Sequence, residues 1–388
     1  MQDHTVNLVR GLAEAGHEVE VVCPLHPDGL MSAEYEGARW HFVDAVPQRA
    51  RLPMRNPLWL ERSADLFSTL QAERAFDLVH SESTSGLGLL RRRWHERLPI
   101  VVKFHGNYLT FARAGLRRLV GGNEVVREAK GLIWNTGQTL TRGNWYAFRA
   151  CEAMVPSRAQ RRGTIRSHLL RSSRVHVVPN GIDADAFAPG DRKTARAEVG
   201  LPDGMVFVVL GRLYPGKGVD VAIRALAQVD ADASLVVVGD GESRGELEEL
   251  ARDVEAGERV RFVGVQPRER MPAYLRGADA LVFPTLLPEA APLTPLQAMA
   301  AGVPVLASRL GAIPELLDRP GVNGLLVQAG DVAQLARGME ALARDPSLRG
   351  RLGAAGRERV LAEYTLGRMI ERTLDVYEVA RARFARGR

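Results

Sequence analysis

The chain contains few cysteines and no long apolar run. Cys23 and Cys151 are the only cysteines among 388 residues, each borders a strand-like apolar run, and neither belongs to a metal-ligand pattern. Their scarcity excludes a disulfide framework and a cysteine-ligated zinc site, and predicts two buried, reduced thiols. No apolar run reaches the roughly 18 residues of a membrane-spanning helix, and the polar N-terminal stretch lacks a secretory signal. We therefore expect a cytoplasmic protein.

The positive charge of the chain is concentrated in its first half. The formal net charge is +6, because residues 1–190 contain 25 Lys and Arg against 19 Asp and Glu, whereas residues 191–388 contain 27 of each. Arg91–Arg93 and Arg161–Arg162 are candidate phosphate contacts for a nucleic acid. They lie in expected helices without interleaved aromatic residues, so a solvated helix face is favoured. An anionic membrane or acceptor is the next interpretation, and nucleic acid is not expected.

Short β-rich runs alternate with longer helical runs along the whole chain. This pattern predicts an α/β fold with parallel sheets, and the length suffices for two domains with separate cores. We expect an N-terminal domain at residues 1–187, a C-terminal domain at 188–362 and a final helix at 363–388. The expected strands are Glu18–Val22, Arg39–Val43, Asp77–His80, Ile100–Phe104, Ala153–Pro156, Arg174–Val178, Met205–Leu210, Ser234–Val238, Arg261–Val263, Ala280–Phe283, Val303–Leu306 and Gly324–Val327.

A glycine-rich turn follows the first expected strand of the second domain. It runs from Gly211 to Gly218, contains Arg212 and Lys217, and opens a helix. Glycine lets the backbone approach a ligand closely, and two cations suit a phosphate group. The spacing differs from that of a P-loop. A surface turn with solvated charges would look the same, but a phosphate site is favoured because of the motif that follows.

The segment Pro288–Leu306 is the most informative part of the sequence. It contains Glu289 in a loop and enters a short helix at Leu293 and Thr294. The first turn of a helix carries free backbone N–H groups that attract anions. A carboxylate beside these groups suits a sugar attached to a diphosphate.

These two motifs together resemble the signature of retaining glycosyltransferases of the GT-B fold, family 4, also called glycosyl transferases group 1. The resemblance implies two Rossmann-like domains that face across a cleft, and a C-terminal helix that crosses back to the first domain. It also implies that Glu289 binds hydroxyl groups of the transferred sugar and that Leu293 and Thr294 present N–H groups to the diphosphate. The family's motif is Glu-x7-Glu, and the second Glu is Gln297 in this chain.

Further donor-binding residues are implied by the same resemblance. Gly211, Arg212 and Lys217 match the loop that holds the leaving diphosphate. Gly239 and Gly241 match a turn under the nucleotide. Because the cations can replace a divalent metal, we expect neither a metal nor a cofactor beyond a UDP- or GDP-type sugar as substrate. Asp183-Ala184-Asp185 looks like the metal motif of another glycosyltransferase fold, but it lies at the domain connection, and we reject metal binding there.

His105 is the candidate catalytic residue of the first domain. It follows the strand Ile100–Phe104, where ligands of such sheets bind. A lone histidine at a strand end is more often structural, but the resemblance implies an imidazole near the donor sugar. Asn107 and Asn180 are expected on the acceptor side. We further expect Phe111–Ile133 to form a basic, partly apolar surface beside the acceptor or an anionic membrane, although an ordinary amphipathic helix pair would have the same pattern.

Gln297 has two interpretations. The run Thr294–Gln297 reads as a capping box, with Thr294 at the N-cap, Pro295 at the first helical position and Gln297 reaching back. Alternatively, Gln297 binds the ribose diol of the nucleotide, with a weaker bond than a carboxylate would make.

The sequence thus predicts retaining, metal-independent transfer of a hexose from a nucleoside-diphosphate sugar to a glycan, lipid or small-molecule acceptor. Catalysis is expected to depend on His105, Glu289, Arg212 and Lys217. Two alternatives remain: a nucleotide-sugar 2-epimerase on the same fold, and a non-catalytic nucleotide-sugar-binding protein.

The start of the chain departs from the pattern of such domains. A doubly wound domain opens with a strand and a glycine-rich turn, whereas this chain opens on a helix that ends at Gly16. We therefore expect that the first strand of the N-terminal domain is missing and that the natural protein begins upstream of Met1.

Overall fold

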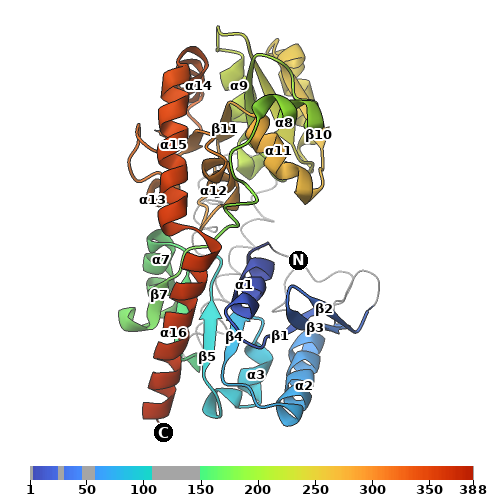
Figure 1. Ribbon diagram of the computed structural model, residues 1–388, viewed down its shortest axis with the longest axis vertical. Coiled ribbons are helices and arrows are strands. Elements are labelled where there is room, and N and C mark those ends of the chain that lie inside the picture. Colours follow the sequence, from blue (N-terminus) through green and yellow to red (C-terminus); the bar gives the residue numbers. More distant parts are fainter. Residues whose placement is uncertain (1–2, 25–29, 46–56, 107–148, 388) are drawn as a thin grey trace, which may run out of the picture. The chain divides into compact units, whose positions relative to one another are not determined.

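The computed structural model describes residues 3–24, 30–45, 57–106 and 149–387, which divide into two compact units (Figure 1). Unit 1 consists of Met1–Gly181 and Leu366–Arg388, and unit 2 consists of Ile182–Thr365. Unit 1 is therefore built from both ends of the chain, and unit 2 is a continuous stretch between them.

Unit 2 contains one parallel sheet of six strands, in the order β10-β9-β8-β11-β12-β13. Alternate residues of β8 enter two different cores: Val206 and Val208 pack on one face of the sheet, and Phe207 and Val209 pack on the other. This alternation is the period of a strand buried on both faces. The strands are β8 (Met205–Leu210), β9 (Ala233–Val238), β10 (Val260–Gly264), β11 (Ala280–Phe283), β12 (Val305–Ser308) and β13 (Leu325–Val327).

Helices cover both faces of this sheet. The core that contains Val206 also includes residues of α8 (Arg192–Val199), α11 (Met271–Gly277) and α12 (Leu293–Ala300). The core that contains Phe207 includes residues of α9 (Val219–Leu226), α10 (Arg244–Asp253) and α14 (Val332–Arg344). Helices on both faces of a parallel sheet form a doubly wound, Rossmann-like unit. The remaining helices of unit 2 are α13 (Ile313–Leu316) and α15 (Pro346–Glu363).

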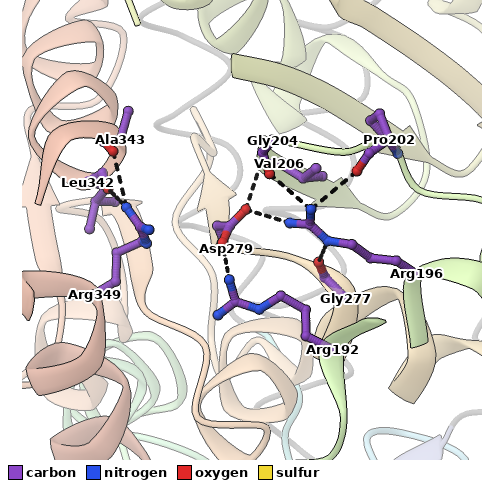
Figure 2. Close-up of polar contacts among 10 residues, drawn as sticks. All are labelled: Arg192, Arg196, Pro202, Gly204, Val206, Gly277, Asp279, Leu342, Ala343 and Arg349. Carbon is purple, nitrogen blue, oxygen red and sulfur yellow. Dashed lines mark hydrogen bonds and ion pairs between the residues drawn. The ribbon is translucent and has the colours of Figure 1, made fainter. Parts of the chain in front are cut away.

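A buried carboxylate attaches α8 to the sheet (Figure 2). Asp279, directly before β11, is 4% exposed and accepts hydrogen bonds from Arg192, from Arg196 Nη2 at 2.7 Å and from the backbone N–H of Val206 at 2.8 Å. Arg196 also donates to the carbonyl of Gly277 at 2.8 Å. The carboxylate thus joins one helix and two strands, and its burial is offset by three donors.

The described residues of unit 1 form two sheets. A four-stranded parallel sheet has the order β4-β5-β6-β7, and a three-stranded sheet has the order β1-β3-β2. The strands are β1 (Glu20–Pro24), β2 (Ser32–Tyr35), β3 (Ala38–Val43), β4 (Val79–Glu82), β5 (Ile100–Lys103), β6 (Glu152–Val155) and β7 (Val175–Val177). Each strand expected from the sequence is present with small shifts of its ends. Among the strands that the structure describes, β2 alone was not expected, and its side chains are mostly exposed.

Helices also cover both faces of the four-stranded sheet, so the predicted α/β architecture of two Rossmann-like units is confirmed. On one face lie α2 (Pro57–Glu73), α3 (Leu87–Arg91) and α7 (Arg158–His168). On the other lie α1 (Asp3–Glu14) and α16 (Leu366–Arg386), which stand beside β5 in Figure 1. Arg383 of α16 forms an ion pair with buried Glu152 of β6, with Nε 2.8 Å from Oε1. The final helix is therefore part of the core of unit 1.

The two sheets of unit 1 are not hydrogen-bonded to each other within the described residues. β1 pairs only with β3, and β4 pairs only with β5, so each is an edge strand of its sheet. The expectation of a further strand in this domain stays a prediction.

Both thiols are free, as expected, but they are partly rather than fully buried. Burial raises the pKa of Cys23 to about 11 and raises that of Cys151. In the described part of the chain, no helix has both the length and the apolar character needed to cross a membrane.

Candidate active site

Four loops meet at the carboxyl edge of the sheet of unit 2, and glycines let them pack closely. They follow β8, β9, β11 and β12. A Cβ at Gly239 would lie 2.0 Å from the carbonyl oxygen of Gly211, and one at Gly241 would lie 2.1 Å from that of Leu213. A Cβ at Gly218 would lie 2.1 Å from the carbonyl oxygen of Pro284. Real side chains do not tolerate such distances, so glycines at these positions hold the loops together.

The loop that carries Glu289 is fixed from its own backbone. Ala312 donates its N–H to the carbonyl of Glu289 at 2.8 Å. Gly311, with φ of 57°, lies so close that a Cβ there would meet that carbonyl oxygen at 2.2 Å. The loop after β12 thereby sets the position of the Glu289 carboxylate, a contact that the sequence did not reveal.

Lys217 and Glu289 form a direct ion pair. Lys217 Nζ lies 2.8 Å from Glu289 Oε1, and the two side chains are 23% and 22% exposed. The Lys217 ammonium also lies 5.4 Å from the ring centroid of Phe283 and 5.9 Å from that of Tyr214. Aromatic faces attract a cation at these distances. Lys217 and Glu289, which the sequence analysis identified in separate motifs, are therefore in direct contact.

Both partners of this pair have unused hydrogen-bonding capacity. Among the described residues, none donates a hydrogen bond to Glu289 Oε2, and an ammonium carries three donors. The pair can therefore accept a hydroxyl group through the carboxylate and donate to a phosphate oxygen through Lys217. This combination is what a sugar diphosphate requires.

Arg212 does not join this group. Its side chain is 71% exposed and forms an ion pair with Glu242 at 3.0 Å. An exposed pair of this kind contributes little stability, so the Arg212 side chain is free to turn toward a ligand at low cost. Its expected role as a phosphate contact stays a prediction.

Helix α12 begins four residues after Glu289, and two residues earlier than the sequence indicated. Pro292 occupies the N-cap and no side chain caps the helix. Thr294 and Pro295 are therefore inside the helix, and the expected capping box is wrong. The N–H groups of Leu293 and Thr294 belong to the first turn, where they lack intrahelical acceptors. Gln297 consequently has no capping function, and no described residue is hydrogen-bonded to its partly buried side chain.

In unit 1, His105 follows β5 and its Nε2 is hydrogen-bonded to Glu82 at the end of β4. His4 Nε2 of α1 lies 3.5 Å from the other oxygen of Glu82. The ring of His4 packs edge-on against that of His105, with centroids 4.9 Å apart. The sequence singled out His105 but missed Glu82, whose only signal was a carboxylate at the end of a neighbouring strand.

More ionisable groups surround this contact. His80 Nδ1 shares a hydrogen bond with the hydroxyl of Tyr377 at 2.6 Å. Lys103, 1% exposed, is the strand partner of Glu82, and its ammonium has no hydrogen-bond partner in the part of the chain described. We call the following six residues the Glu82 cluster: His4, His80, Glu82, Lys103, His105 and Tyr377.

Burial governs the protonation of this cluster. Burial, together with the charge of Lys103, lowers the pKa of His4 to about 4, and burial lowers that of His80 to about 4. Burial also lowers the pKa of Lys103 to about 8. Burial alone would raise the pKa of the Glu82 carboxyl, but the hydrogen bond from His105 and the proximity of His4 outweigh it and hold that pKa well below its usual value. At neutral pH the cluster contains a carboxylate, an ammonium and neutral His4 and His80 rings.

Three ligand atoms of this cluster have the spacing of a metal site. Atoms of His4, Glu82 and His105 lie within 4.8 Å of one another. A divalent ion would lie near the Lys103 ammonium, whose charge already acts on His4. The carboxylate and ammonium balance each other, and a further double positive charge would be costly in a buried site. The arrangement favours a hydrogen-bonded network over a metal centre.

Several candidate residues lie elsewhere or outside the described residues. Asn180 is buried before the boundary between the units. Asp183, part of the rejected metal motif, accepts the N–H of Ala186 at 3.0 Å, which is a turn contact. Asn107 and the expected basic surface Phe111–Ile133 lie outside the described residues, so their roles stay predictions.

Two family models match the chain. The model described as Glycosyl transferases group 1 matches residues 191–359, and the model described as Glycosyltransferase Family 4 matches residues 1–186. A D-inositol 3-phosphate glycosyltransferase of Nocardiopsis dassonvillei is 31% identical over 408 aligned positions, which cover 98% of this chain and 90% of the relative. A second one, of Catenulispora acidiphila, is 36% identical over 222 positions, 53% of this chain and 52% of the relative.

Solved structures show the same architecture. A sucrose-phosphate synthase of Thermosynechococcus elongatus has a TM-score of 0.80 at 24% identity, over 96% of this chain and 91% of that one. The Anabaena protein HepE, in complex with UDP, has a TM-score of 0.74 at 19% identity, over 96% and 95% of the two chains. At these identities the likeness shows the fold.

Proposed function

The chain belongs to the glycosyl transferases of group 1 and family 4, which have the GT-B fold and use nucleotide-sugar donors. From this premise we propose that it catalyses retaining transfer of a hexose without a divalent metal. The donor is a UDP- or GDP-type sugar, and the acceptor is a hydroxyl group of a glycan, lipid or small molecule. HepE was solved with UDP, so UDP-sugars are the first donors to test.

The observation that carries this proposal is the ion pair of Lys217 and Glu289 beside the start of α12. When the bond between the sugar and the phosphate breaks, positive charge grows on the sugar ring and negative charge grows on the diphosphate. Lys217 and the N–H groups of the first turn stabilise the diphosphate. Glu289 binds sugar hydroxyls and carries a negative charge that favours a cationic ring. Such electrostatic contributions are worth about 3–4 kcal/mol for each donor.

Retention follows if the acceptor attacks from the face that the diphosphate leaves. The bond from the anomeric carbon to the phosphate oxygen breaks, the bond to the acceptor oxygen forms on the same face, and the acceptor proton passes to the diphosphate. Glu289 is held by Lys217 and serves as a binding group in this scheme. His105 is assigned to a hydroxyl group of the donor sugar.

The acceptor is proposed from the relatives. The two relatives described above are named for D-inositol 3-phosphate, a polyol with one phosphate group. The basic excess of the first half of this chain suits an anionic acceptor. D-inositol 3-phosphate is therefore the first acceptor to offer.

The test is a transfer assay with UDP- and GDP-hexoses, a panel of acceptors that includes D-inositol 3-phosphate, and excess chelator. We expect a glycosylated product whose anomeric configuration, read by NMR, equals that of the donor. An inverted product or a requirement for added metal would contradict the proposed mechanism. Sugar epimerisation without transfer would identify the epimerase, and nucleotide binding without any turnover would identify the binding protein.

Replacing Lys217 by alanine is expected to lower kcat by about 10²-fold, since it removes a charge that acts mainly on the departing diphosphate. Arg212→Ala removes the second cation of the same loop, which is paired with Glu242. We expect a loss of similar size, because this side chain is predicted to turn to the diphosphate. Steady-state kinetics would contradict this assignment if Lys217→Ala raised KM alone.

Replacing Gln297 by glutamate is expected to tighten nucleotide binding if this position reads the ribose, because a charged acceptor strengthens the hydrogen bond by roughly 1 kcal/mol or more. A capping function would have made the exchange neutral, and the structure removes that function. Calorimetric titration with UDP and GDP measures the change. An unchanged affinity would place Gln297 away from the ribose.

A further inference from the structure

Glu82 and His105 lie at the ends of adjacent parallel strands. Glu82 is the register partner of Lys103, and His105 follows two residues later, just beyond the edge of the sheet. The His105 Nε2 is in hydrogen-bond contact with Glu82 Oε2. The contact therefore depends on β-sheet geometry, which holds both backbones rigidly.

The chemistry of the contact defines which nitrogen of His105 carries hydrogen. The hydrogen bond from His105 and the nearby His4 ring keep Glu82 ionised despite its burial. An ionised carboxylate only accepts hydrogen bonds, so Nε2 of His105 must be the donor. In the neutral ring, Nδ1 is then a bare acceptor. No described residue is hydrogen-bonded to His105 Nδ1.

Two neighbours restrict movement of this pair. The His4 ring packs edge-on against the His105 ring, and His4 Nε2 lies 3.5 Å from Glu82 Oε1. The Lys103 ammonium, in register with Glu82, supplies a positive charge from the same face of the sheet. Glu82 is thus surrounded by groups that favour its charged form and a single orientation.

We propose that Glu82 is the positioning residue of His105: it fixes the tautomer with hydrogen on Nε2 and presents Nδ1 to a hydroxyl group of the donor sugar. This inference rests on the proposed function for its kinetic part, because His105 must act on the substrate. Its structural part, the tautomer, stands independently. Carboxylates that orient a functional histidine in this way are worth about 10–100-fold when histidine is a metal ligand, and we expect a similar effect here.

A carboxylate–imidazole contact can also be purely structural, and the chain contains a matched example. His41 Nε2 lies 2.5 Å from Glu20 Oε2 between β3 and β1. This pair has the same chemistry and partial burial but joins two strands of the other sheet. Glu20→Gln is therefore the control for Glu82→Gln.

The first experiment reads the tautomer in the full chain. With selectively ¹⁵N-labelled histidine, NMR chemical shifts distinguish a protonated from a bare ring nitrogen, and His105→Asn assigns the signal. We expect the neutral form of the His105 ring to have a bare Nδ1, and a mixture of tautomers in Glu82→Gln. The Glu20→Gln variant should leave the His105 signals unchanged. A His105 ring with hydrogen on Nδ1, or one unaffected by Glu82→Gln, would overturn the proposal.

The second experiment is a double-mutant cycle on transfer. Glu82→Gln should lower kcat by about 10–100-fold, with little change in the donor KM. In a His105→Ala background, the same exchange should lower kcat by no more than about twofold, because Glu82 then has no His105 to orient. The effects of independent residues on kcat would multiply within about that margin, whereas those of coupled residues do not. Equal costs in both backgrounds would overturn the proposal. If His105→Ala itself leaves kcat unchanged, the role of His105 in the proposed function fails, whatever the tautomer shows.

The removal of Glu82 leaves the buried Lys103 ammonium uncompensated, which is costly for folding on its own account. The double variant Glu82→Gln/Lys103→Met removes both charges and keeps the volume of the cluster. Thermal unfolding checks that it is folded, and both experiments are then repeated on it with Lys103→Met as the reference. A loss of kcat relative to Lys103→Met supports the positioning role, and equal kcat values would overturn it.

Discussion

Replacement of Glu289 by glutamine is expected to lower kcat by about 10³-fold while the protein stays folded. The amide has the shape of the carboxylate, but it cannot hold the charge of Lys217, 2.8 Å away, nor stabilise positive charge on the sugar ring. The pair is only about one-fifth exposed, so the exchange leaves a largely desolvated ammonium without its partner and costs some stability, which the melt measures. The measurements are steady-state kinetics and a thermal melt of the same preparation.

Glu248→Gln is the matched control for Glu289→Gln. Glu248 is also paired to a cation, Arg244 at 2.8 Å, but on the surface of α10. We expect wild-type kcat in this variant. Near-normal turnover of Glu289→Gln would show that Glu289 has no part in the mechanism. A much lower melting temperature of this variant would show that the loss of activity results from unfolding.

Replacement of Asp279 by alanine is expected to destabilise unit 2 by about 3–5 kcal/mol. The exchange leaves Arg196, whose side chain is 15% exposed, without its carboxylate, and leaves the Val206 N–H without its side-chain acceptor. Removing one partner of a buried ion pair is costly because the remaining charge is uncompensated. Urea unfolding, followed by the circular dichroism of the chain, measures the change in the free energy of unfolding.

Arg192→Ala separates the buried from the exposed part of this network (Figure 2). The side chain of Arg192 is 53% exposed. When Arg192 is replaced, Asp279 keeps its hydrogen bonds from Arg196 and from the Val206 N–H. We expect a loss of about 1 kcal/mol or less. Equal losses for the two variants would show that burial is not what makes Asp279 important.

The strands of both units were predictable because each is a local apolar pattern. Met205–Leu210 and Ala280–Phe283 were predicted with the ends that the structure gives. The edge strand β2 (Ser32–Tyr35) was missed because its mostly exposed side chains give no apolar alternation. The start of α12 was misplaced because Thr294 and Gln297 have the spacing of a capping box, whereas the loop geometry puts Pro292 at the N-cap.

The contacts of the site were less predictable than its residues. Lys217 and Glu289 were each identified from their own motif, but their ion pair joins loops 72 positions apart. Likewise, His105 was identified at its strand end, whereas Glu82 and Lys103 became visible only through the register of β4 with β5. Pairwise contacts of this kind depend on the packing of loops and strands, which periodicity alone does not specify.

The return of α16 to unit 1 has a consequence for synthesis on the ribosome. The core of unit 1 includes Met369, Ile370 and Val376 of α16, and all of unit 2 is translated before they emerge. At 5–20 residues per second, the stretch Ile182–Thr365 takes roughly 10–40 s. During this interval the nascent sheet of β4 to β7 lacks the helix that covers one of its apolar faces. When the interval ends, unit 2 has its whole sequence, whereas unit 1 still waits for α16. We therefore expect the second unit to complete its fold first and the last helix to close the first unit.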